Sequence, residues 1–367
     1  MKVSILLVSY NNARFLAKVI DSILAQTFTD FELLILDNGS TDDSLEILNS
    51  YTDERIKIYS ENKNLGPEGC WNYLFKRSSG EYIRIICSDD LMHLSCIEKQ
   101  VHILDSTSNI DFVFTNIQVV DCDCNNIPNY TQTINLQNTR FEYLRYGFYE
   151  GNPFLTPTFM GRRIMFESND FIMEERRSYF GDYTAWLRLM IDGYNPHVIE
   201  EVLIYSIKGG HNMTAFTSDR KKANFTFALN NYLETYCAIK SIEDLEKILP
   251  EVKEYTSKIT NNDTDLIPFI IAMIAFEVKS VKQFESFSQS HTIFALNKIY
   301  QLLGDRDLAK KIEDIFQFNY FDFVKMTQEC PISEVGSKSK VLENSKSSKN
   351  CKKITRKIKK IFCRVKC

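Results

Sequence analysis

Apolar positions in the first 120 residues follow two alternating patterns. Short, almost continuous apolar runs are typical of strands buried on both faces of a sheet. Longer stretches with apolar residues three or four positions apart are typical of amphipathic helices. The predicted strands are 3–8, 31–36, 56–59, 82–86 and 112–120, and the predicted helices are 13–25, 42–49, 66–77 and 95–104.

This alternation of strand and helix predicts an α/β fold with a doubly wound, mostly parallel sheet of the Rossmann-like kind and helices on both faces. Between 125 and 180 the periodicity breaks down, and prolines and glycines indicate loops and short elements, which often carry the residues that recognise a substrate. A helix at 182–191 and a strand at 197–205 follow, and beyond residue 220 the pattern is helical. The predicted domains are 1–218 (with 1–120 and 121–218 as its parts) and a helical region, 219–332.

The end of the chain has a different composition. Residues 333–350 are rich in Ser and Lys, which predicts a disordered linker. Residues 351–367 are basic, contain no acidic residue, and place apolar side chains on one helical face. Two interpretations remain open: a solvated, charged end, or an interfacial helix that binds an anionic membrane surface.

Composition narrows the class of protein and its compartment. The chain has 367 residues and a formal net charge of -4, which argues against nucleic acid as a partner. The first residues lack the pattern of a secretion signal, and the longest apolar run is too short to cross a bilayer. Ten cysteines are scattered without a zinc-type spacing. We therefore expect a cytoplasmic protein with reduced cysteines, peripheral at the inner face of the cell membrane if the tail binds lipid.

Polar residues follow four of the predicted strands, at the point where each strand ends. These segments are Ser9-Tyr10-Asn11-Asn12, then 37–40, then 62–66, and then Ser88-Asp89-Asp90. Ligands of parallel sheets bind at the carboxyl ends of the strands, so all four segments are expected on the same edge. Carboxylates, amides and glycines gathered there predict a ligand rich in hydroxyl and phosphate groups.

The Asp89-Asp90 pair is the strongest of these signals. Neighbouring side chains that leave a strand point to opposite sides, so one carboxylate can bind a divalent ion while the other binds a ribose hydroxyl. Mg²⁺ and Mn²⁺ both favour oxygen ligands, including one or two carboxylates and substrate phosphates. The alternative is that Asp89 caps the next helix and that Asp90 lies favourably at the N-terminus of this helix.

Taken together, these segments resemble glycosyltransferase family 2, the inverting enzymes with the GT-A fold. The resemblance covers about residues 1 to 215, and its motifs occur in the family's order and spacing. The matching segments are Ser4 to Asn11, Ser22-Ile23-Leu24-Ala25-Gln26-Thr27, Leu36 to Asp42, Asn64-Leu65-Gly66, Gly80-Glu81-Tyr82-Ile83 and Ser88-Asp89-Asp90.

The resemblance implies a role for individual residues. Asp37 would bind the base or ribose, Asp89 the ribose or the metal, and Asp90 the metal, while His211 would close over the diphosphate or the metal. A lone His is more often an ordinary surface residue, so this last role rests on the resemblance alone. The expected nucleotide-sugar site is Ser9, Tyr10, Asn11, Asp37, Asn64, Gly66, Asn72 and Asp89, and the expected metal ligands for Mg²⁺ or Mn²⁺ are Asp90, Asp89 and His211.

Asp182 is the candidate catalytic base. The segment from Gly181 to Arg188 resembles the family's Glu-Asp-Tyr-x-x-Trp-Leu-Arg segment, with Gly181 in place of the Glu. The reaction needs a carboxylate that removes the proton of the acceptor hydroxyl during attack on the anomeric carbon. The alternative is that Asp182 caps a helix whose Trp186 and Leu189 belong to the core, and both roles are compatible.

Three positions depart from the family pattern. Cys87 stands where many members have the first acid of an Asp-x-Asp-Asp run, Trp71 replaces a more usual Arg, and Gly181 replaces a Glu. These departures weaken the expected metal site and remove one phosphate contact. They leave open a non-catalytic descendant that binds a sugar nucleotide without transferring the sugar.

Other classes of enzyme fit less well. A nicotinamide oxidoreductase should show Gly-x-Gly-x-x-Gly after the first strand, and a nucleotidyltransferase should show a glycine-rich loop with a basic residue there. Neither is present, nor is the Gln-x-x-Arg-Trp motif of processive synthases. We therefore predict an inverting glycosyltransferase that moves one sugar from a nucleotide-sugar, UDP-linked by resemblance, to a hydroxyl of a glycan or lipid-linked acceptor. Surface polysaccharide or glycoconjugate synthesis is the expected setting, and O-glycosylation of a protein is an alternative.

Overall fold

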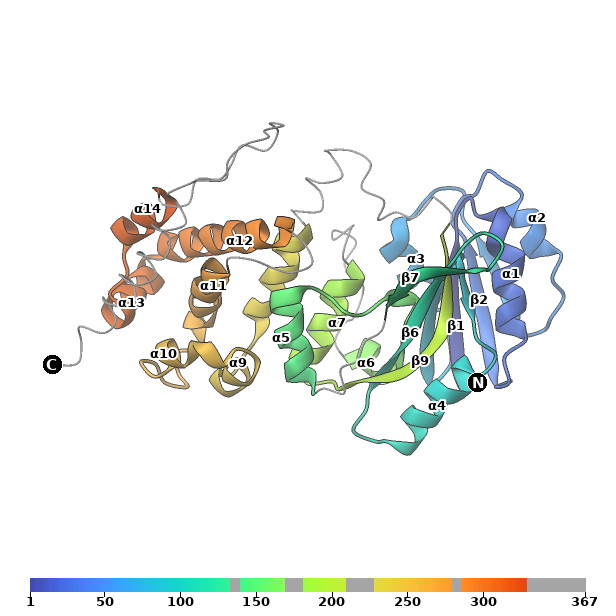
Figure 1. Ribbon diagram of the computed structural model, residues 1–367, viewed down its shortest axis with the longest axis horizontal. Helices are drawn as coiled ribbons and strands as arrows, with labels where there is room; N and C mark the ends of the chain where they lie inside the picture. The colour runs from blue at the N-terminus through green and yellow to red at the C-terminus, as the bar shows by residue number, and fades with distance from the viewer. Residues whose placement is uncertain (133–138, 169–180, 209–227, 279–284, 329–367) are drawn as a thin grey trace. The chain divides into compact units, whose positions relative to one another are not determined.

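The chain separates into two compact units. The first comprises Met1–Ile239 and the short segment Lys282–Phe287, and the second comprises Lys240–Val281 and Ser288–Cys367. The first unit is built around one sheet, whereas the described part of the second contains only helices (Figure 1). The computed structural model describes residues 1–132, 139–168, 181–208, 228–278 and 285–328.

The predicted domain boundary at residue 218 lies outside the described residues. Residues 228–239, which form a helix followed by the short 3₁₀ helix η2 (Thr235–Ala238), group with the first unit. The predicted linker, 333–350, and the predicted basic tail, 351–367, also lie outside the described residues.

Four parallel strands form the N-terminal half of the sheet. β1 (Val3–Ser9) pairs with β2 (Phe31–Asp37) on one side and with β4 (Tyr82–Cys87) on the other, and β3 (Ile56–Ser60) lies beyond β2. Every residue of β2 and all but one of β1 are buried. The prediction that these apolar runs are strands buried on both faces is therefore confirmed. A strand covered on both faces has no exposed side, so its sequence does not alternate between apolar and polar residues.

The strand register brings the ends of these strands to one edge. Ser9 aligns with Asp37, and Val8 aligns with Cys87. The residues that follow β1, β2 and β4 therefore begin at the same level of the sheet, as expected for a ligand site at the carboxyl edge.

The remaining strands make the sheet mixed. β8 (Met160–Arg162) is antiparallel to β4 and to β6 (Phe112–Val120), while β9 (Pro196–Ile207) is parallel to β6. β5 (Asp90–Met92) is antiparallel to β9, and β7 (Asn126–Gln132) is antiparallel to β6. The predicted α/β fold with a mostly parallel sheet is confirmed, with these antiparallel additions. The strand order is β3-β2-β1-β4-β8-β6-β9-β5, with β7 beside β6.

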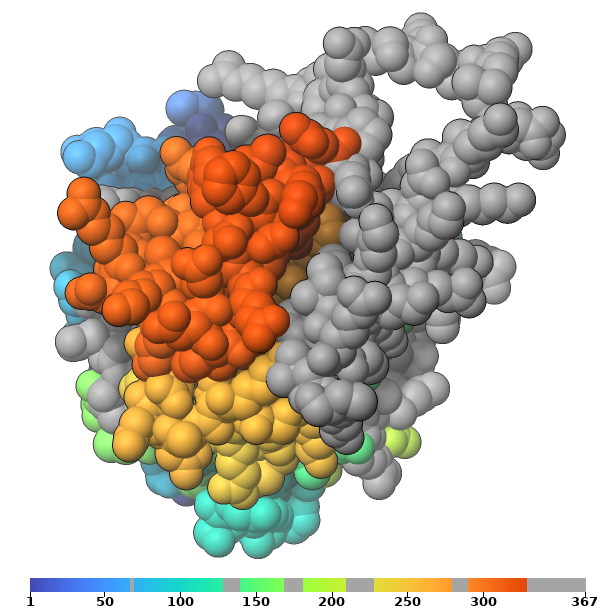
Figure 2. All heavy atoms as spheres, turned by 90° about the vertical axis from the view of Figure 1, so that its left-hand side faces the viewer, coloured from blue at the N-terminus to red at the C-terminus, as the bar shows by residue number. Residues whose placement is uncertain are grey.

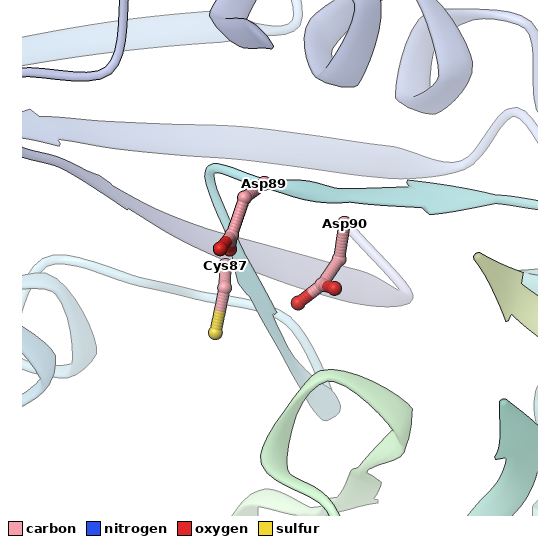
Figure 3. Close-up of side chains that lie close together, drawn as sticks. All are labelled: Cys87, Asp89 and Asp90. Atoms are coloured by element: carbon pink, nitrogen blue, oxygen red, sulfur yellow. The ribbon is translucent and has the colours of Figure 1, made fainter. Parts of the chain in front are cut away.

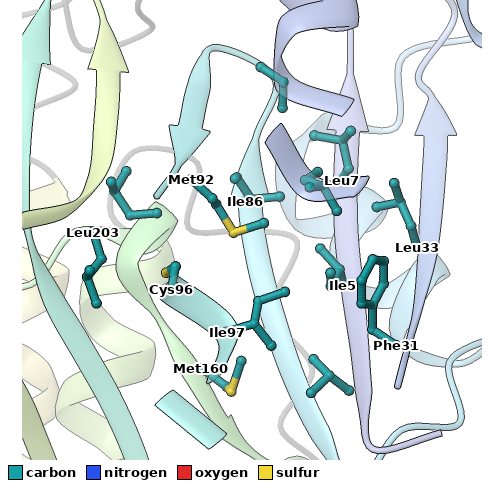
Figure 4. Packing of buried hydrophobic residues seen from close by; sticks show 14 of the residues in the cluster. Ile5, Leu7, Phe31, Leu33, Ile86, Met92, Cys96, Ile97, Met160 and Leu203 are labelled. Atoms are coloured by element: carbon teal, nitrogen blue, oxygen red, sulfur yellow. The ribbon is translucent and has the colours of Figure 1, made fainter. Parts of the chain in front are cut away.

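Helices cover the sheet on both faces. α1 (Ala13–Leu24) and α2 (Ser44–Asn49) lie on one side of the strands in Figure 1, and α3 (Gly66–Phe75) contacts β1 and β2 from the other. Alternate β1 residues from Val3 to Leu7 pack with α1 and α4 (Cys96–Ser106) in the main apolar core (Figure 4). The helical spacing of apolar residues thus matches the face that each helix buries.

The segment predicted to lack periodic structure contains a three-turn helix, α5 (Arg140–Glu150), so the prediction is wrong there. Thr139 caps this helix by accepting from the backbone N–H of Glu142, whose side chain accepts from the backbone of Thr139. This capping box was visible in the sequence as Thr-x-x-Glu. Gly147 in α5 reflects close packing, because an added Cβ would lie 2.6 Å from the Tyr232 hydroxyl.

Short elements follow α5 and lead to the candidate base. They are η1 (Thr156–Thr158), β8 and α6 (Arg163–Ser168). α7 (Gly181–Ile191) carries Asp182 in its first turn, and the predicted helix at 182–191 is confirmed.

The described part of the second unit consists of α-helices and short 3₁₀ helices. In Figure 2 the orange and red surface of its later helices adjoins the gold surface of the earlier ones. α11, with the sequence IPFIIAMIAFE, is buried almost all round, which explains its apolar run without a membrane. Within the described residues, every helix is too short or too polar to cross a bilayer. The elements are α9 (Ile242–Ile248), η3 (Pro250–Val252), α10 (Lys253–Thr256), η4 (Thr264–Leu266), α11 (Ile267–Glu277), α12 (Glu285–Gly304), α13 (Arg306–Phe316) and α14 (Tyr320–Gln328).

Candidate active site

Two buried polar atoms without partners mark the carboxyl edge of the sheet. Ser9 is fully buried at the end of β1, and Asp37 is 2% exposed at the end of β2. The Ser9 Oγ and Asp37 Oδ1 atoms find no hydrogen-bond partner among the described residues. Because buried polar atoms are normally satisfied, each is a candidate contact for a ligand that supplies hydrogen-bonding groups. These are two of the residues that the sequence predicts at the nucleotide-sugar site.

Asn11 lies at the same edge, where it holds a neighbouring loop. Its backbone is left-handed, with φ of 50°, and its side-chain oxygen accepts a 2.7 Å hydrogen bond from the Thr41 amide. The backbone N–H of Asn11 donates to the Ser40 hydroxyl at 3.0 Å. The predicted ligand contact at Asn11 is therefore accompanied by a structural role that already uses its side chain.

Asn64 and Gly66 lie in the loop between β3 and α3. The Asn64 Oδ1 atom accepts from the Asn38 side chain at 3.0 Å and from the Gly66 amide at 2.8 Å. Gly66 has φ of 75°, a conformation that side chains strongly disfavour. The family motif Asn-Leu-Gly thus has a local cause, since the amide and the glycine together turn the chain into α3.

The two other predicted donor-site residues differ in exposure. Tyr10 is 47% exposed beside Ser9, and Asn72 is half-buried in the second turn of α3. An exposed aromatic ring at the carboxyl edge is free to contact a planar group of a ligand.

Cys87, Asp89 and Asp90 come together at the end of β4. One ligand atom from each, the thiol sulfur or a carboxylate oxygen, lies within 4.8 Å of the other two. Figure 3 shows the three side chains directed toward a common region. The expectation that Asp89 and Asp90 point to opposite sides is wrong, because Ser88 and Asp89 form a turn rather than extended strand. The alternative role of Asp89 as a helix cap is also wrong, since Ser95 occupies the N-cap position of α4.

Asp90 is deeply buried for a carboxyl group. It is 3% exposed, begins β5, and is aligned with Ser206 of β9. Burial raises the pKa of Asp90 to about 8, and the neighbouring charge of Asp89 adds to this rise. Hydrogen bonds from Ser206 and Cys87 oppose the rise. Burial also raises the pKa of Asp89. Two carboxyl groups that repel each other in a buried place are favoured as anions when a cation lies between them.

The residues present fit a divalent ion. The Asp90 Oδ1 atom is buried and has no partner among the described residues, and Asp89 offers a second carboxylate. Carboxylate oxygens are the ligands that Mg²⁺ and Mn²⁺ prefer. His211, the third predicted ligand, lies outside the described residues.

Asp182 is held by two donors in the first turn of α7. The Thr156 hydroxyl donates to its Oδ2 atom, and the Tyr183 amide donates to Oδ1 at 2.9 Å. Burial raises the pKa of Asp182, while the Thr156 hydrogen bond lowers it. Burial raises the pKa of the Cys87 thiol, and the negative charges of Asp90, Asp89 and Asp182 add to this rise, so the candidate base lies within electrostatic range of the candidate metal group.

Arg84 is a buried cation that sequence reasoning missed. It is fully buried in β4, and its guanidinium donates to the backbone carbonyls of Pro157 and Phe159. Pro157 lies within η1, which also carries Thr156, and Phe159 directly follows η1. Arg84 thus ties the strand that ends at the metal group to the turn that contacts Asp182. The available signal was a charged residue within the apolar run of β4.

Aromatic packing fixes α7 against the sheet. Trp186 is fully buried, stacks on Phe159 with ring centroids 4.2 Å apart, and meets Phe114 of β6 edge-on at 5.6 Å. Phe114 in turn stacks on Phe154 at 4.2 Å. Such contacts add to ordinary apolar burial, so Trp186 belongs to the core and orients the helix that carries Asp182.

Known proteins share this architecture. S. aureus TarS, residues 1–349, solved in complex with UDP, superposes with a TM-score of 0.55 at 15% identity, over 83% of this chain and 92% of that one. TarS has also been solved with UDP-GlcNAc, with a TM-score of 0.50. This likeness shows that the chain has the GT-A fold that TarS adopts.

Sequence relatives agree with this class. An uncharacterized glycosyltransferase of Rickettsia felis is 27% identical over 298 residues, which cover 66% of this chain and 46% of the relative. Another, from Haemophilus influenzae, is 27% identical over 296 residues, covering 73% of this chain and 90% of the relative. The chain thus spans less than half the length of the Rickettsia relative. The family described as glycosyl transferase family 2 matches residues 4–169 of this chain.

Proposed function

We propose that the chain is an inverting, metal-dependent glycosyltransferase that moves one sugar from a UDP-sugar to an acceptor hydroxyl. The observation that carries this proposal is the set of buried, unpartnered polar atoms at one sheet edge. These are Ser9 Oγ, Asp37 Oδ1 and Asp90 Oδ1, and each lies at or just beyond the end of a strand. A nucleotide diphosphate with a divalent ion supplies partners for hydroxyl and carboxylate groups alike.

In this proposal the donor lies across the carboxyl edge. Ser9, Tyr10 and Asp37 bind the nucleoside, and the loop at Asn64 and Gly66 lies beside it. Asp89, Asp90 and His211 would hold the divalent ion, and Asn72 would contribute to binding the nucleotide-sugar. The bound ion would offset the charge that grows on the departing diphosphate. The complexes of TarS with UDP and UDP-GlcNAc support a uridine nucleotide.

Asp182 serves as the general base. Its carboxylate accepts the proton of the acceptor hydroxyl while that oxygen forms a bond to the anomeric carbon. The bond from the anomeric carbon to the diphosphate oxygen breaks, and UDP leaves from the opposite face, so the anomeric configuration inverts. Thr156 keeps Asp182 oriented and favours its ionised form, which is the form that accepts a proton.

The acceptor in this proposal is a glycan or a lipid-linked sugar used in surface polysaccharide or glycoconjugate synthesis. The basic tail, 351–367, then holds the protein at the anionic inner face of the cell membrane. Deleting 333–367 should abolish sedimentation with vesicles that contain anionic lipid and leave release of nucleotide from a soluble donor unchanged. Equal sedimentation of the full and shortened chains would refute the membrane role.

Nucleotide release tests the central proposal. The purified chain would be incubated with UDP-, GDP- and dTDP-sugars and Mn²⁺, with and without chelator, and free nucleotide measured. We expect release from a UDP-sugar that chelator abolishes, with losses of ~10²–10⁴-fold in Asp182→Asn, the usual contribution of a general base. Asp90→Asn should lose release and bind Mn²⁺ weakly.

Asp53→Asn is the matched control, because Asp53 pairs with Arg55 outside the candidate site. It should retain full activity. Calorimetric binding of the same donors separates two negative outcomes. Donor binding without release, in the presence of candidate acceptors, would favour the non-catalytic descendant, and absence of binding would refute the donor site itself.

A further inference from the structure

The candidate metal group contains a sulfur atom as well as carboxylates. Cys87 is the last residue of β4, and its thiol lies in the group whose ligand atoms are within 4.8 Å of one another. In Figure 3 the sulfur and both carboxyl groups face the same region. The backbone of β4 is held in register by β1, so the position of this thiol is set by the sheet rather than by a loose loop.

A second observation points to a ligand at this place. The Asp90 Oδ1 atom lies in a side chain that is 3% exposed, and it finds no partner among the described residues. A thiol and a buried carboxylate oxygen that both face one place form a mixed donor set. Cys87 hydrogen-bonds to the Asp90 side chain within this group, whereas Cys96 donates to Gln100 in the core and Cys122 donates to the Lys208 carbonyl.

We propose that Cys87 is a ligand of the metal together with Asp89 and Asp90, and that the site selects Zn²⁺, Co²⁺ or Cd²⁺ over Mg²⁺. Thiolate is a soft ligand that favours such ions, whereas Mg²⁺ strongly prefers oxygen. On binding, the sulfur gives up its proton to solvent and donates a lone pair to the ion. This inference rests on the proposed function, since it assigns the identity of the ion that the donor site holds.

Cadmium titration of the full chain tests this proposal. Chelator-treated protein would be titrated with Cd²⁺ alone while the ultraviolet sulfur-to-cadmium charge-transfer absorbance is recorded. Competition with Mg²⁺ and with Zn²⁺ would follow. The variants are Cys87→Ser, which removes the soft donor, and Cys87→Asp, which replaces it by a carboxylate. Cys122→Ser is the matched control, a partly buried cysteine in the turn that follows β6.

We expect the high-affinity absorbance step to persist in Cys122→Ser and to disappear in Cys87→Ser. Cadmium affinity should fall by at least ~10–100-fold, the loss that even an outer-shell change causes. Cys87→Asp should bind Mg²⁺ more tightly than the wild type does. Circular dichroism of both Cys87 variants checks that they fold. Both variants lack the thiol, so if one fails to fold, the other can still be compared with the wild type.

Two results would overturn the inference. One is an unchanged charge-transfer step in Cys87→Ser, and the other is equal competition by Mg²⁺ and Zn²⁺ in the wild type. Either result leaves the proposed transferase intact if a donor sugar is still released in a chelator-sensitive way. Loss of nucleotide release with every ion, together with normal cadmium binding through Cys87, would instead refute the proposed function and leave the metal assignment standing.

Discussion

The Thr156 hydroxyl donates a hydrogen bond to Oδ2 of Asp182 and joins the turn η1 to the first turn of α7. The two residues are 26 positions apart in the sequence, and they come from a turn and a helix that share no regular pairing. The contact opposes the effect of burial on Asp182, because a hydrogen bond to a carboxylate stabilises its charged form. Burial has the larger effect on the pKa of Asp182, and a residue outside the family motif partly offsets it.

Replacing Thr156 by Val should shift the pH dependence of the reaction. Without the hydroxyl the pKa of Asp182 rises further, so the acidic limb of kcat/KM moves to higher pH. At pH values on this acidic limb the rate should fall by about tenfold or more, since hydrogen bonds to charged groups contribute ~1.5–3 kcal/mol. Thr156→Ser retains the donor and should keep the original profile. An unshifted acidic limb in Thr156→Val would contradict the role of this contact.

Replacing Asp90 by Asn should stabilise the metal-free protein while removing metal binding. The pKa of Asp90 is about 8 in the folded chain and ~3.9 when unfolded, so the folded state holds the proton more tightly between these values. Stability therefore falls as pH rises from 4 to 8, by linkage. The variant lacks this ionisation and should have the higher Tm at pH 8, with a smaller difference at pH 5. Thermal melts of both proteins in chelator at the two pH values measure this, and a variant less stable at pH 8 would contradict the buried state of Asp90.

Replacing Arg84 by Met should destabilise the first unit and impair the site together. The change leaves the carbonyls of Pro157 and Phe159 without their buried donor, at a cost of about 1–3 kcal/mol for each. Because η1 carries Thr156, the acidic limb of the pH profile should move in the same direction as in Thr156→Val. Urea unfolding measures the stability, and the pH profile measures the coupling. A destabilised variant with a normal profile would show that Arg84 supports the fold alone.

Replacing Trp186 should lower the free energy of unfolding, because its side chain is fully buried in the core. Trp186→Ala leaves a cavity between Phe114 and Phe159 and should cost ~3–5 kcal/mol of unfolding free energy. Trp186→Phe should cost less, because the indole N–H has no partner among the described residues and only part of the ring volume is lost. Chemical denaturation of the two variants gives the comparison. If Trp186→Phe and Trp186→Ala lose equal amounts of unfolding free energy, the prediction that ring volume determines the loss is wrong.

The sequence predicted the parallel half of the fold well, because buried strands such as β2 and amphipathic helices such as α1 leave strong periodic patterns. It missed α5, whose capping box at Thr139 and Glu142 was overlooked among prolines and glycines. It also missed β5 and β8, which are three residues long and too short to carry a period. Their pairing depends on contacts with strands distant in the sequence, which no local pattern reveals.

For the candidate site, the sequence correctly predicted which loops meet at the carboxyl edge of the sheet. This prediction needs only the positions at which the parallel strands end. It did not foresee that Asp89 turns toward Asp90, because alternation holds only in extended chain and Ser88 begins a turn. The roles of Arg84 and Thr156 were also not predicted from the sequence. Both act through hydrogen bonds between distant segments, and neither belongs to a motif.

The hydrogen bonds of Asn11 have a practical consequence for redesigning the donor specificity of this protein. Asn11 and its neighbours after β1 are bound to the loop after β2 by Ser40, Thr41 and the Asp42 carboxylate, which accepts from the Ala13 amide at 3.0 Å. The two loops therefore form one interdependent part. A chimaera that imports either loop alone from a relative would lose these bonds, whereas exchanging both together, as a cassette, preserves them.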